Sequence, residues 1–316
     1  MRTSVILSTY NGEKYILQQI ESIYKQTIKP DEVIICDDCS SDNTVNIIKK
    51  FINDHNLNNW NIYINKENKG YAKNFIDGAK KAKNDILFYS DQDDIWHTKK
   101  IEHMCNAIKE TNALAIYCLL ETIDENGKRI NNKIDKMNRI KGEQLLKKVS
   151  LSEKLKYARS SGLCLAFKKE ILNELTIISE KYNLPHDIPV GTIAAINDRY
   201  YVLNEVLVYR RIHMKNVSNP NTKITESFGD IDRQLKSRYI KLKELNAINE
   251  IYYNKLNFNN QNLLIEAIKN TKGIISCLEN KKILKMLKYL INSNSMMNKK
   301  LLIRNFISLI NHKIRG

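Results

Sequence analysis

The segment SDQDDIW, from Ser90 to Trp96, places three aspartates, Asp91, Asp93 and Asp94, within four positions. It follows directly on the apolar run ILFY at 86–89, which is typical of a strand. Carboxylates crowded at the end of a buried strand repel one another, and removing them from water is costly. A protein tolerates such a cluster when a cation or a positively charged group lies among the carboxylates. The segment therefore predicts a binding site for a cation or for a cationic partner.

Short apolar runs alternate with amphipathic helical patterns on both sides of this segment. The expected strands are Thr3–Ser8, Glu32–Cys36, Asn61–Ile64, Asp85–Tyr89 and Ser161–Phe167, with Tyr200–Val202 and Glu205–Tyr209 as a pair of short strands. The expected helices are Glu13–Gln26, 42–51, Tyr71–Lys83, Thr98–Lys109, Lys168–Lys181 and Ile188–Ile196. Near-continuous apolar strands separated by helices indicate a sheet that is covered on both faces. The predicted fold class is α/β, with a Rossmann-like, mixed but mostly parallel sheet.

Polar side chains gather where three of these strands end. The first strand leads into Ser8–Gly12, the second into Asp37–Ser40 and the fourth into Asp91–Asp94. Ligands of open parallel sheets bind beyond the carboxyl ends of the strands, so these segments should meet at one edge. Alternatively, they are turn and cap residues, because Asp, Asn and Ser are common in strand-to-helix loops. Capping does not explain paired acids at two separate strand ends, so we favour a binding site.

The composition is typical of a globular protein of the cytoplasm. Of the 316 residues, 42% are hydrophobic and 27% charged, which favours a folded chain. No run approaches the roughly 20 uncharged apolar residues that cross a bilayer, and the N-terminus, MRTSVILSTYN, lacks the features of a signal peptide. The Cys36–Cys39 pair lacks the second pair or nearby histidines of a structural zinc site, so we expect the cysteines to be small hydrophobic residues.

The positive charge is concentrated near the C-terminus. The net charge is +16, and residues 221–316 hold 18 Lys and Arg against 7 Asp and Glu. From about residue 223 the apolar spacing is helical, with a helix expected from 281 to the end. Within 281–290 and 299–315, basic residues are interleaved with leucine and isoleucine. This pattern suits peripheral contact with the inner face of the plasma membrane. A helical packing module with a solvated lysine face is the alternative, and the sequence leaves both open.

Seven parts of the sequence, in this order, resemble bacterial family 2 glycosyltransferases of the GT-A fold. They are VILSTYNGEKY (5–15), QT with DEVIICDDCSSDNT (26–27 and 31–44), ENKGYAKN (67–74), SDQDDIW (90–96), SGLCLAF (161–167), PHD (185–187) and YRRIHMKNVS (209–218). The resemblance implies a GT-A catalytic domain at 1–220, followed by an all-helical, basic region at 221–316. Cys39 departs from the family pattern, in which glycine is common.

The resemblance and the spacing agree on the opening aspartates. Asp91 and Asp93 form an Asp-x-Asp motif whose side chains fall on the same side of an extended loop. Their hard oxygen ligands suit Mn²⁺ or Mg²⁺, which would bind the diphosphate of a nucleotide sugar and stabilise the charge that the leaving group gains. The family often has a histidine near the metal at the position of His213. Asp94 is expected to cap the next helix, and Trp96 to anchor the core.

The resemblance also implies nucleotide contacts at the strand ends. Asp38 matches the aspartate that accepts a hydrogen bond from a pyrimidine base, and Tyr10 can stack on that base. The predicted nucleotide-binding residues are Ser8, Thr9, Tyr10, Asp38, Lys73 and Asp91. Lys73 and Arg159 are candidate phosphate contacts, with a solvated surface role as the alternative.

The resemblance places the catalytic base at Asp187, in PHD. Family members invert the anomeric centre in a single displacement, in which one carboxylate deprotonates the acceptor hydroxyl. The alternative role of Asp187 is the N-cap of the helix that follows. Arg210 or Arg211 could neutralise the leaving group, and strand alternation should send them to opposite faces.

The predicted activity is therefore that of an inverting, metal-dependent glycosyltransferase. Relatives with SDQDDxW commonly build capsule, cell-wall or lipopolysaccharide glycans, and many resemble rhamnosyltransferases. The implied donor is dTDP-rhamnose or a UDP-hexose, and the implied acceptor is a glycan or lipid-linked glycan. A nucleotidylyltransferase should begin with a glycine-rich basic phosphate loop, which TYNGEKY is not. A non-catalytic nucleic-acid or membrane binder is a further alternative. We expect no nucleic-acid partner, because the basic tail shows neither interleaved exposed aromatics nor a recognised module.

Overall fold

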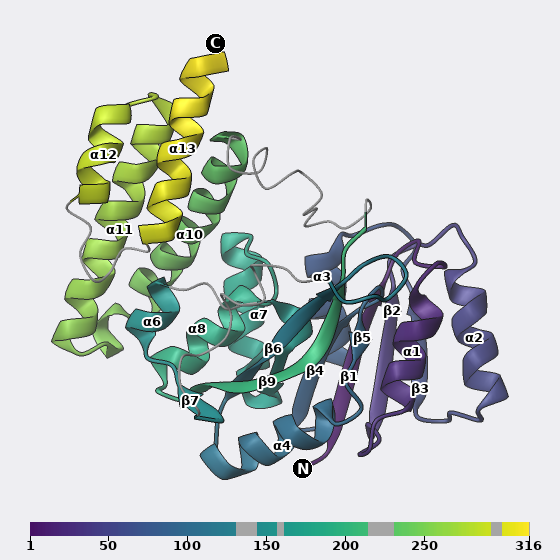
Figure 1. The fold of residues 1–316 in the computed structure, drawn as a ribbon. Coiled ribbons are helices and arrows are strands. Elements are labelled where there is room, and N and C mark those ends of the chain that lie inside the picture. Colours follow the sequence, from purple (N-terminus) through teal and green to yellow (C-terminus); the bar gives the residue numbers. More distant parts are fainter. Residues whose placement is uncertain (131–143, 157–160, 214–230, 292–298, 316) are drawn as a thin grey trace. The chain divides into compact units, whose positions relative to one another are not determined.

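The computed structural model describes residues 1–130, 144–156, 161–213, 231–291 and 299–315 (Figure 1). The chain forms two compact units, each built from segments that are distant in the sequence. The first comprises residues 1–149, 159–179 and 185–212, and the second comprises residues 150–158, 180–184 and 213–316.

A mixed sheet is the frame of the first unit, and nine strands belong to it within the described ranges. They are β1 (Thr3–Thr9), β2 (Glu32–Asp37), β3 (Trp60–Ile64), β4 (Ile86–Asp91), β5 (Ile95–Trp96), β6 (Ala115–Ile123), β7 (Leu146–Lys148), β8 (Leu165–Lys168) and β9 (Tyr200–Arg211). Their order is β3-β2-β1-β4-β8-β6-β9-β5, and β7 pairs with β9. Strands β3, β2, β1 and β4 are parallel, whereas β8 is antiparallel to both β4 and β6. The predicted α/β class is confirmed.

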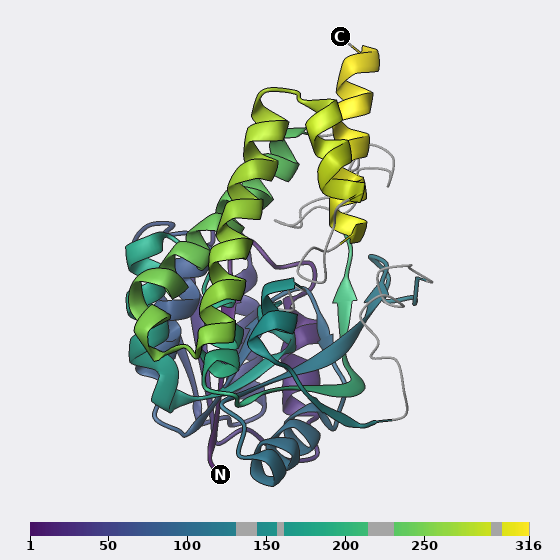
Figure 2. The ribbon, with the colours of Figure 1, turned by 90° about the vertical axis from the view of Figure 1, so that its left-hand side faces the viewer.

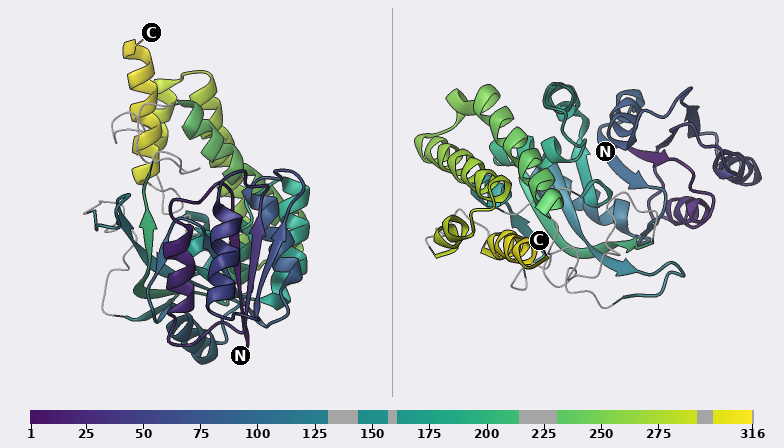
Figure 3. Two further views of the ribbon diagram at one scale, coloured as in Figure 1. Left: turned by 90° about the vertical axis from the view of Figure 1, so that its right-hand side faces the viewer. Right: turned by 90° about the horizontal axis from the view of Figure 1, so that it is seen from above.

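Helices cover both faces of this sheet, and α1 and α3 lie on opposite faces (Figure 3). The helices are α1 (Ile16–Tyr24), α2 (Thr44–Asp54), α3 (Tyr71–Lys81), α4 (Lys100–Thr111), α7 (Leu172–Tyr182) and α8 (Ile188–Ile196), with short 3-10 helices at Gly162–Cys164 and Lys169–Ile171. The strands between them carry uninterrupted apolar runs, of which 5–7, 33–35 and 87–89 are completely buried. Such runs are expected of strands with no solvent-facing side.

Three expectations about strands are wrong. The expected strand Ser161–Phe167 begins with a 3-10 helix at Gly162–Cys164, and β8 begins only at Leu165. The apolar run at 115–123, which we did not assign, is the long buried strand β6 between β8 and β9. The expected pair of short strands after Tyr200 is the single strand β9. It runs parallel to β6 through two register shifts between Cys118 and Leu120. A bulge interrupts side-chain alternation, so one irregular strand gives the sequence pattern of two.

The second unit is helical, and α10 and α11 run side by side in it (Figure 2). Its helices are α6 (Leu151–Lys156), α10 (Ile231–Tyr252), α11 (Phe258–Glu279), α12 (Ile283–Ile291) and α13 (Lys299–Arg315), with a 3-10 helix at Tyr253–Lys255. The expected single helix from 281 to the end is thus two helices, α12 and α13. On α6 the buried Lys154 Nζ lies 3.3 Å from Glu244 Oε1 of α10, which ties α6 to this unit.

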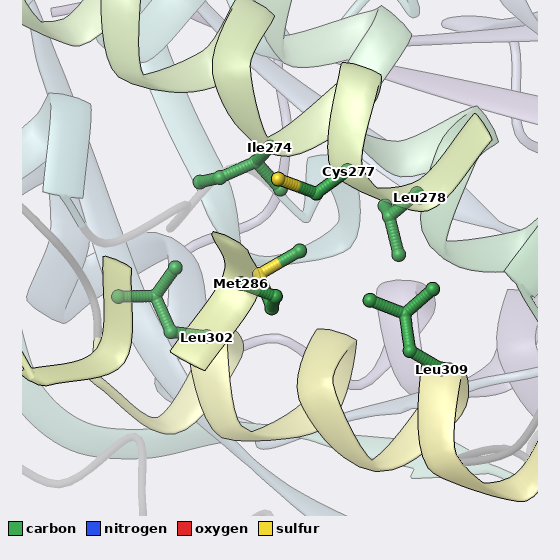
Figure 4. Packing of buried hydrophobic residues seen from close by; sticks show 6 residues of the cluster. All are labelled: Ile274, Cys277, Leu278, Met286, Leu302 and Leu309. Carbon is green, nitrogen blue, oxygen red and sulfur yellow. The ribbon is translucent and has the colours of Figure 1, made fainter. Parts of the chain in front are cut away.

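An apolar core holds α11, α12 and α13 together (Figure 4). The buried side chains of this core are Ile274, Cys277, Leu278, Met286, Leu302 and Leu309. Ile231 and Leu235 of α10 pack against them. The described apolar side chains of α13 at Leu302 and Leu309 therefore face other helices, as the packing alternative predicts.

The assignment of 1–220 as the catalytic domain and of 221–316 as a helical region remains a prediction about function. The division between the two compact units lies close to it, between residues 212 and 213. Among the helices of the described ranges, none has the length and apolar character needed to cross a bilayer.

Candidate active site

The carboxyl ends of β1, β2 and β4 meet at one edge of the sheet. Thr9 lies beside Asp37 in the parallel register, and Ser8 lies beside Asp91. Asn74 of α3 joins two of these strands, because its Nδ2 donates to Ser8 Oγ at 2.8 Å and to a backbone carbonyl of β2 at 2.7 Å. The structure therefore brings Ser8, Thr9 and Asp91 together, as their positions in the sequence predict.

Asp37, at the end of β2, shapes the loop that follows it. Its Oδ1 accepts from Thr9 Oγ1 at 2.8 Å, and its Oδ2 accepts from the backbone N–H of Ser40, also at 2.8 Å. The side chain is completely buried. Because hydrogen bonds satisfy both oxygens, the burial of this carboxylate is compensated.

Asp38 organises the loop at 65–70. Its Oδ1 accepts from Asn65 Nδ2 at 2.9 Å and from the N–H of Lys69 at 2.8 Å. Its Oδ2 accepts from the N–H of Gly70 at 2.8 Å, and Gly70 has φ +83°, where glycine is favoured. A carboxylate has about four acceptor positions, and these bonds use three of them, which leaves room for one more donor at Oδ2. The base contact of Asp38 remains a prediction for that position.

The Asp-x-Asp segment clamps the backbone of Tyr10. Gln92 Nε2 donates to the Tyr10 carbonyl, and the Tyr10 N–H donates to Gln92 Oε1, both at 2.8 Å. The side chain of Tyr10 is 47% exposed. Because its backbone is fixed and its aromatic ring is exposed, Tyr10 is suited to stack on a flat ligand.

Asp91 and Asp93 form an acidic pair at the end of β4. Burial, and after it the negative charge of Asp93, raises the pKa of Asp91 to about 7, while the positive charge of Arg210 opposes this rise. In the described ranges, no group of three or more His, Cys, Asp or Glu side chains is placed to hold a metal ion. Mg²⁺, however, is usually bound through one or two carboxylates, with water and substrate phosphates as its other ligands. The pair fits that kind of site.

Asp94 does not cap a helix, contrary to our expectation. Helix α4 begins only at Lys100, whereas Asp94 is buried. Its Oδ1 accepts from the backbone N–H of Arg211 at 3.0 Å, which joins the acidic segment to β9. Burial, followed by the charges of Asp93 and Asp91, raises the pKa of Asp94. This carboxyl group therefore links two strands instead of ending a loop.

Arg210 and Arg211 have different surroundings, as strand alternation predicts. The guanidinium of Arg211 is fully buried: its Nε donates to the carbonyl of Asp93 at 3.0 Å, and its Nη1 donates to the carbonyls of Asp124 and Glu125 at 3.2 and 2.8 Å. Arg210 instead acts electrostatically on the acidic pair. Arg211 thus fixes the Asp-x-Asp backbone, and Arg210 is the arginine whose charge acts on Asp91.

Lys100 is a buried cation behind the acidic segment. Its Nζ donates to the carbonyl of Leu163 at 2.6 Å and lies 3.5 Å from the ring centroid of Trp96. Trp96 is itself buried, so its predicted role as a core anchor is confirmed. Burial lowers the pKa of Lys100 to about 8, and Asp94 and Asp91 partly oppose this. Lys100 therefore offsets part of the negative charge at the site.

We expect Lys100→Met to destabilise the protein. The change leaves the carbonyl of Leu163 without its donor and removes a compensating charge, so the free energy of unfolding should fall by about 1–3 kcal/mol. Urea denaturation measures this loss. The exposed neighbour Lys99, changed to Met, is the matched control and should stay within about 0.5 kcal/mol of the parent. Equal stability of the two variants would contradict this role of Lys100.

Asp187 occupies the N-cap position of α8 but makes no capping hydrogen bond with its side chain. Its Oδ2 instead accepts from the backbone N–H of Gly162 at 3.1 Å. The charge of Asp187 contributes to the raised pKa of Asp91. Asp187 and Asp91 also raise the pKa of Tyr71 on α3, although burial is the larger cause there. These effects place Asp187 within electrostatic range of both Asp91 and Tyr71.

His186, the neighbour of Asp187, is a core residue. Its ring stacks on Phe75 at a centroid distance of 4.1 Å and meets Tyr89 edge-on at 4.7 Å. Burial lowers the pKa of His186 to about 3, so the imidazole is neutral at neutral pH. A Cβ on Gly162 would lie 2.8 Å from His186 Nε2. Glycine therefore lets the segments SGLCLAF and PHD touch, and the aromatic contacts fix the loop that carries Asp187.

The other predicted site residues are placed as follows. Lys73 is exposed on α3. His213 follows β9 and belongs to the second unit, so its metal contact remains a prediction. Arg159 lies outside the described residues. Cys36 and Cys39 are free thiols, and burial raises the pKa of Cys36 to about 12, which agrees with a structural role.

Several residues that shape this site were missed by sequence reasoning. Tyr71 and Asn74 lie in ENKGYAKN, Gln92 in SDQDDIW and Gly162 in SGLCLAF, and all four are therefore inside segments that we singled out. Asn65 and Lys100 lie outside them. The signal of Lys100 is weak, because a lysine in a charged helical pattern is usually exposed.

Comparison with known proteins assigns the family. The model of glycosyl transferase family 2 matches residues 4–176, which is more than half of the chain. The chain belongs to glycosyltransferase family 2, and its sheet with flanking helices has the GT-A fold, as the motifs predict.

Similar bacterial proteins are named as glycosyltransferases. An uncharacterized glycosyltransferase of Rickettsia prowazekii is 25% identical over 233 residues, which are 72% of this chain and 69% of the relative. TarS of Staphylococcus aureus, a poly(ribitol-phosphate) beta-N-acetylglucosaminyltransferase, is 30% identical over 40% of this chain and 22% of its own length. RfbG of Shigella flexneri, a dTDP-rhamnosyl transferase, is 36% identical over 34% of this chain and 38% of its own. The chain thus matches only a part of TarS and RfbG.

Solved structures share the fold. A crystal structure of Staphylococcus aureus TarS residues 1–349 with UDP superimposes with a TM-score of 0.58 and 19% identity, over 100% of this chain and 92% of that one. The mannosyltransferase PcManGT of Pyrobaculum calidifontis, in complex with GDP-Man and Mn²⁺, gives a TM-score of 0.54 and 14% identity, over 98% and 87% of the two chains.

Proposed function

We propose that this protein is an inverting, metal-dependent glycosyltransferase that moves a sugar from a pyrimidine nucleotide to a glycan or lipid-linked acceptor. One observation carries the proposal: Asp187 does not cap α8 and acts electrostatically on Asp91. Two carboxyl groups from distant parts of the chain thus lie within electrostatic range of each other. Asp91 suits the metal ion and the donor diphosphate, and Asp187 suits the acceptor hydroxyl.

The nucleotide end of the donor would lie against β1 and β2. Tyr10 offers an exposed ring on a clamped backbone, and Asp38 keeps one acceptor position on Oδ2. A pyrimidine N–H can fill that position. Ser8 and Thr9 lie at the end of the same strand, between the base contact and Asp91. We assign Lys73 to the diphosphate because it is exposed in the first turn of α3, next to Asn74, which bonds to the ends of β1 and β2.

Asp91 and Asp93 would hold Mn²⁺ or Mg²⁺ together with the diphosphate. Their mutual repulsion, seen in the raised pKa of Asp91, is the kind of environment that a divalent cation relieves. The ion supplies stabilisation of the negative charge on the departing nucleoside diphosphate. The proposed third protein ligand is His213. Arg210 adds positive charge on the same side as Asp91.

Asp187 would deprotonate the acceptor hydroxyl. The hydrogen bond from the Gly162 N–H to Asp187 Oδ2 orients the carboxyl group. The stacked, neutral His186 fixes the loop without competing for that proton. As the acceptor oxygen attacks the anomeric carbon, the bond from that carbon to the diphosphate breaks, and the configuration inverts.

The donor and the pathway are inferred from the relatives. TarS is crystallised with UDP and with UDP-GlcNAc, and RfbG is named a dTDP-rhamnosyl transferase. Both uracil and thymine carry the N–H that Asp38 would bind. We therefore propose dTDP-rhamnose or a UDP-hexose as donor, used in the synthesis of a bacterial surface polysaccharide at the cytoplasmic side of the membrane.

A donor screen tests this proposal. We expect UDP- and dTDP-sugars with Mn²⁺ to raise the melting temperature by roughly 5 °C at saturation, because a ligand at 100 times its Kd stabilises by about 2.7 kcal/mol. EDTA should abolish most of the shift. Purine nucleotides are the control and should have little effect. A metal-independent shift, or an equal shift with GDP and UDP, would contradict the assigned roles of the aspartates.

A nucleotidylyltransferase remains the alternative enzyme class. It would release pyrophosphate from a nucleoside triphosphate and a sugar phosphate, whereas the proposed transferase releases a nucleoside diphosphate. The first loop, TYNGEKY, is not the glycine-rich basic phosphate loop expected of that class, which favours the transferase. Measuring which of the two products forms separates the classes.

A further inference from the structure

Helix α12 has an apolar arc of which only one half is covered. Met286 is buried in the core of the second unit, and Ile283 and Leu290 pack against that core. Three other apolar side chains of the same short helix, Leu284, Leu287 and Ile291, are 77%, 37% and 71% exposed. Their spacing of three and four residues places them in one stripe along the helix. Single exposed leucines are ordinary, but a stripe of this kind on one helix is not.

Lysines line one edge of this stripe. Lys285 and Lys288 of α12 lie on the side of the stripe next to Leu284, Lys282 immediately precedes the helix, and all three are exposed. The sequence contains no Asp or Glu after Glu279, so nothing acidic in the following chain neutralises them. We name Leu284, Leu287 and Ile291, together with Lys282, Lys285 and Lys288, the α12 surface.

We propose that the α12 surface binds an anionic phospholipid bilayer. A helix with an exposed apolar stripe beside lysines lies in the plane of the membrane interface, with its apolar residues among the acyl chains and its lysines at the phosphates. Charge complementarity selects this occupant, because a second copy of the chain would bring its own lysines to the contact. Among the described apolar side chains of α13, Leu302 and Leu309 are already used in the core and Ile303 is exposed singly, whereas α12 carries an exposed stripe of three apolar residues, so α12 is the proposed contact.

This inference deepens the proposed function, since it names the surface that would bring the enzyme to a lipid-linked acceptor. It also rests on separate residues. The α12 surface lies in the second unit, whereas Asp91 and Asp187 belong to the first. Its failure would leave the transferase chemistry untouched.

Co-sedimentation of the full chain with vesicles tests the α12 surface. We expect binding to vesicles that contain phosphatidylglycerol, little binding to phosphatidylcholine alone, and release at high salt. Replacing Lys282, Lys285 and Lys288 by Gln should weaken binding roughly 100-fold, since each basic residue near the surface contributes about fivefold. Replacing Leu284, Leu287 and Ile291 by Gln should weaken it at least about tenfold and preserve the helix.

The matched control replaces the exposed Lys236, Lys243 and Lys269 by Gln, which removes the same charge from α10 and α11. We expect this control to bind as the parent does. An equal loss of vesicle binding in the control and in the α12 variants would show that the attraction is diffuse and would overturn the proposal. Failure of the parent protein to bind anionic vesicles would overturn it as well. Light scattering tests a second outcome. If the parent does not bind vesicles but is a dimer, and the Leu and Ile changes convert it to a monomer, the α12 surface binds a second copy of the chain instead. Nucleotide release from the donor in solution should be unchanged in every variant, so this readout tests the transferase separately.

Discussion

Asp187→Asn should leave donor binding nearly unchanged and lower turnover by about 10²–10⁴-fold, the usual contribution of a positioned general base. The substitution keeps the shape of the side chain, and the Asn Oδ1 can still accept the hydrogen bond from Gly162 that Asp187 accepts now. The loop should therefore keep its conformation while the proton acceptor is lost. Steady-state release of nucleoside diphosphate measures turnover, and a thermal shift with donor and Mn²⁺ measures binding.

Asp198→Asn is the matched control for this variant. Asp198 lies just after the other end of α8, is largely exposed, and has a positive φ that Asn also accepts. We expect parental turnover from it. If Asp187→Asn kept the activity of the parent, the base would have to be another residue.

Asp91→Asn should have the second large effect: it should lower turnover and raise the stability of the metal-free protein. Turnover should fall by at least about 100-fold, because charge stabilisation by a bound metal ion supplies several kcal/mol. The metal-free protein, in contrast, should become more stable at neutral and higher pH. Asn removes a charge that is poorly tolerated at this position, where burial and Asp93 raise the pKa of Asp91 to about 7.

The pH dependence gives this prediction its internal control. Between the unfolded pKa of 3.8 and the folded pKa of about 7, the folded state holds a proton on Asp91 that the unfolded state releases. The contribution of Asp91 to stability therefore falls as the pH rises through this window. Melting curves in EDTA should nearly coincide for parent and variant at about pH 4, and the variant should melt higher at about pH 8. A variant that melts lower than the parent at about pH 8 would contradict the electrostatic description of the site.

Much of the fold could be predicted because burial on both faces leaves a simple signature. The apolar runs in β1, β2 and β4 are uninterrupted, and β1 and β2 are each followed by a helix with a regular apolar period. Strand β9 was mistaken for two strands because its register with β6 shifts twice, and such irregularities depend on the partner strand. The division of the C-terminal helices between α12 and α13 depends likewise on their packing against Met286 and Leu309.

The candidate site was predictable where topology alone places the residues. Parallel strands bring their carboxyl ends to one edge, so Ser8 and Asp91 had to be neighbours. Asp94 was misassigned because its role depends on a hydrogen bond to Arg211, which is 117 positions away in the sequence. Lys100 was missed for the same reason, since only the tertiary structure places Leu163 beside its ammonium group. Local patterns identify caps and strands, but they do not identify partners across the sheet.

The central claim is that the acidic pair at the end of β4 binds a divalent ion together with the donor diphosphate. A crystal soaked with Mn²⁺ and UDP or dTDP, measured at the manganese absorption edge, tests it most directly. We predict an anomalous peak in contact with Asp91 or Asp93 and with the diphosphate, and a pyrimidine ring near Tyr10 and Asp38. Nucleotide bound elsewhere, or bound here with the peak absent while Mn²⁺ is in excess, would contradict the account.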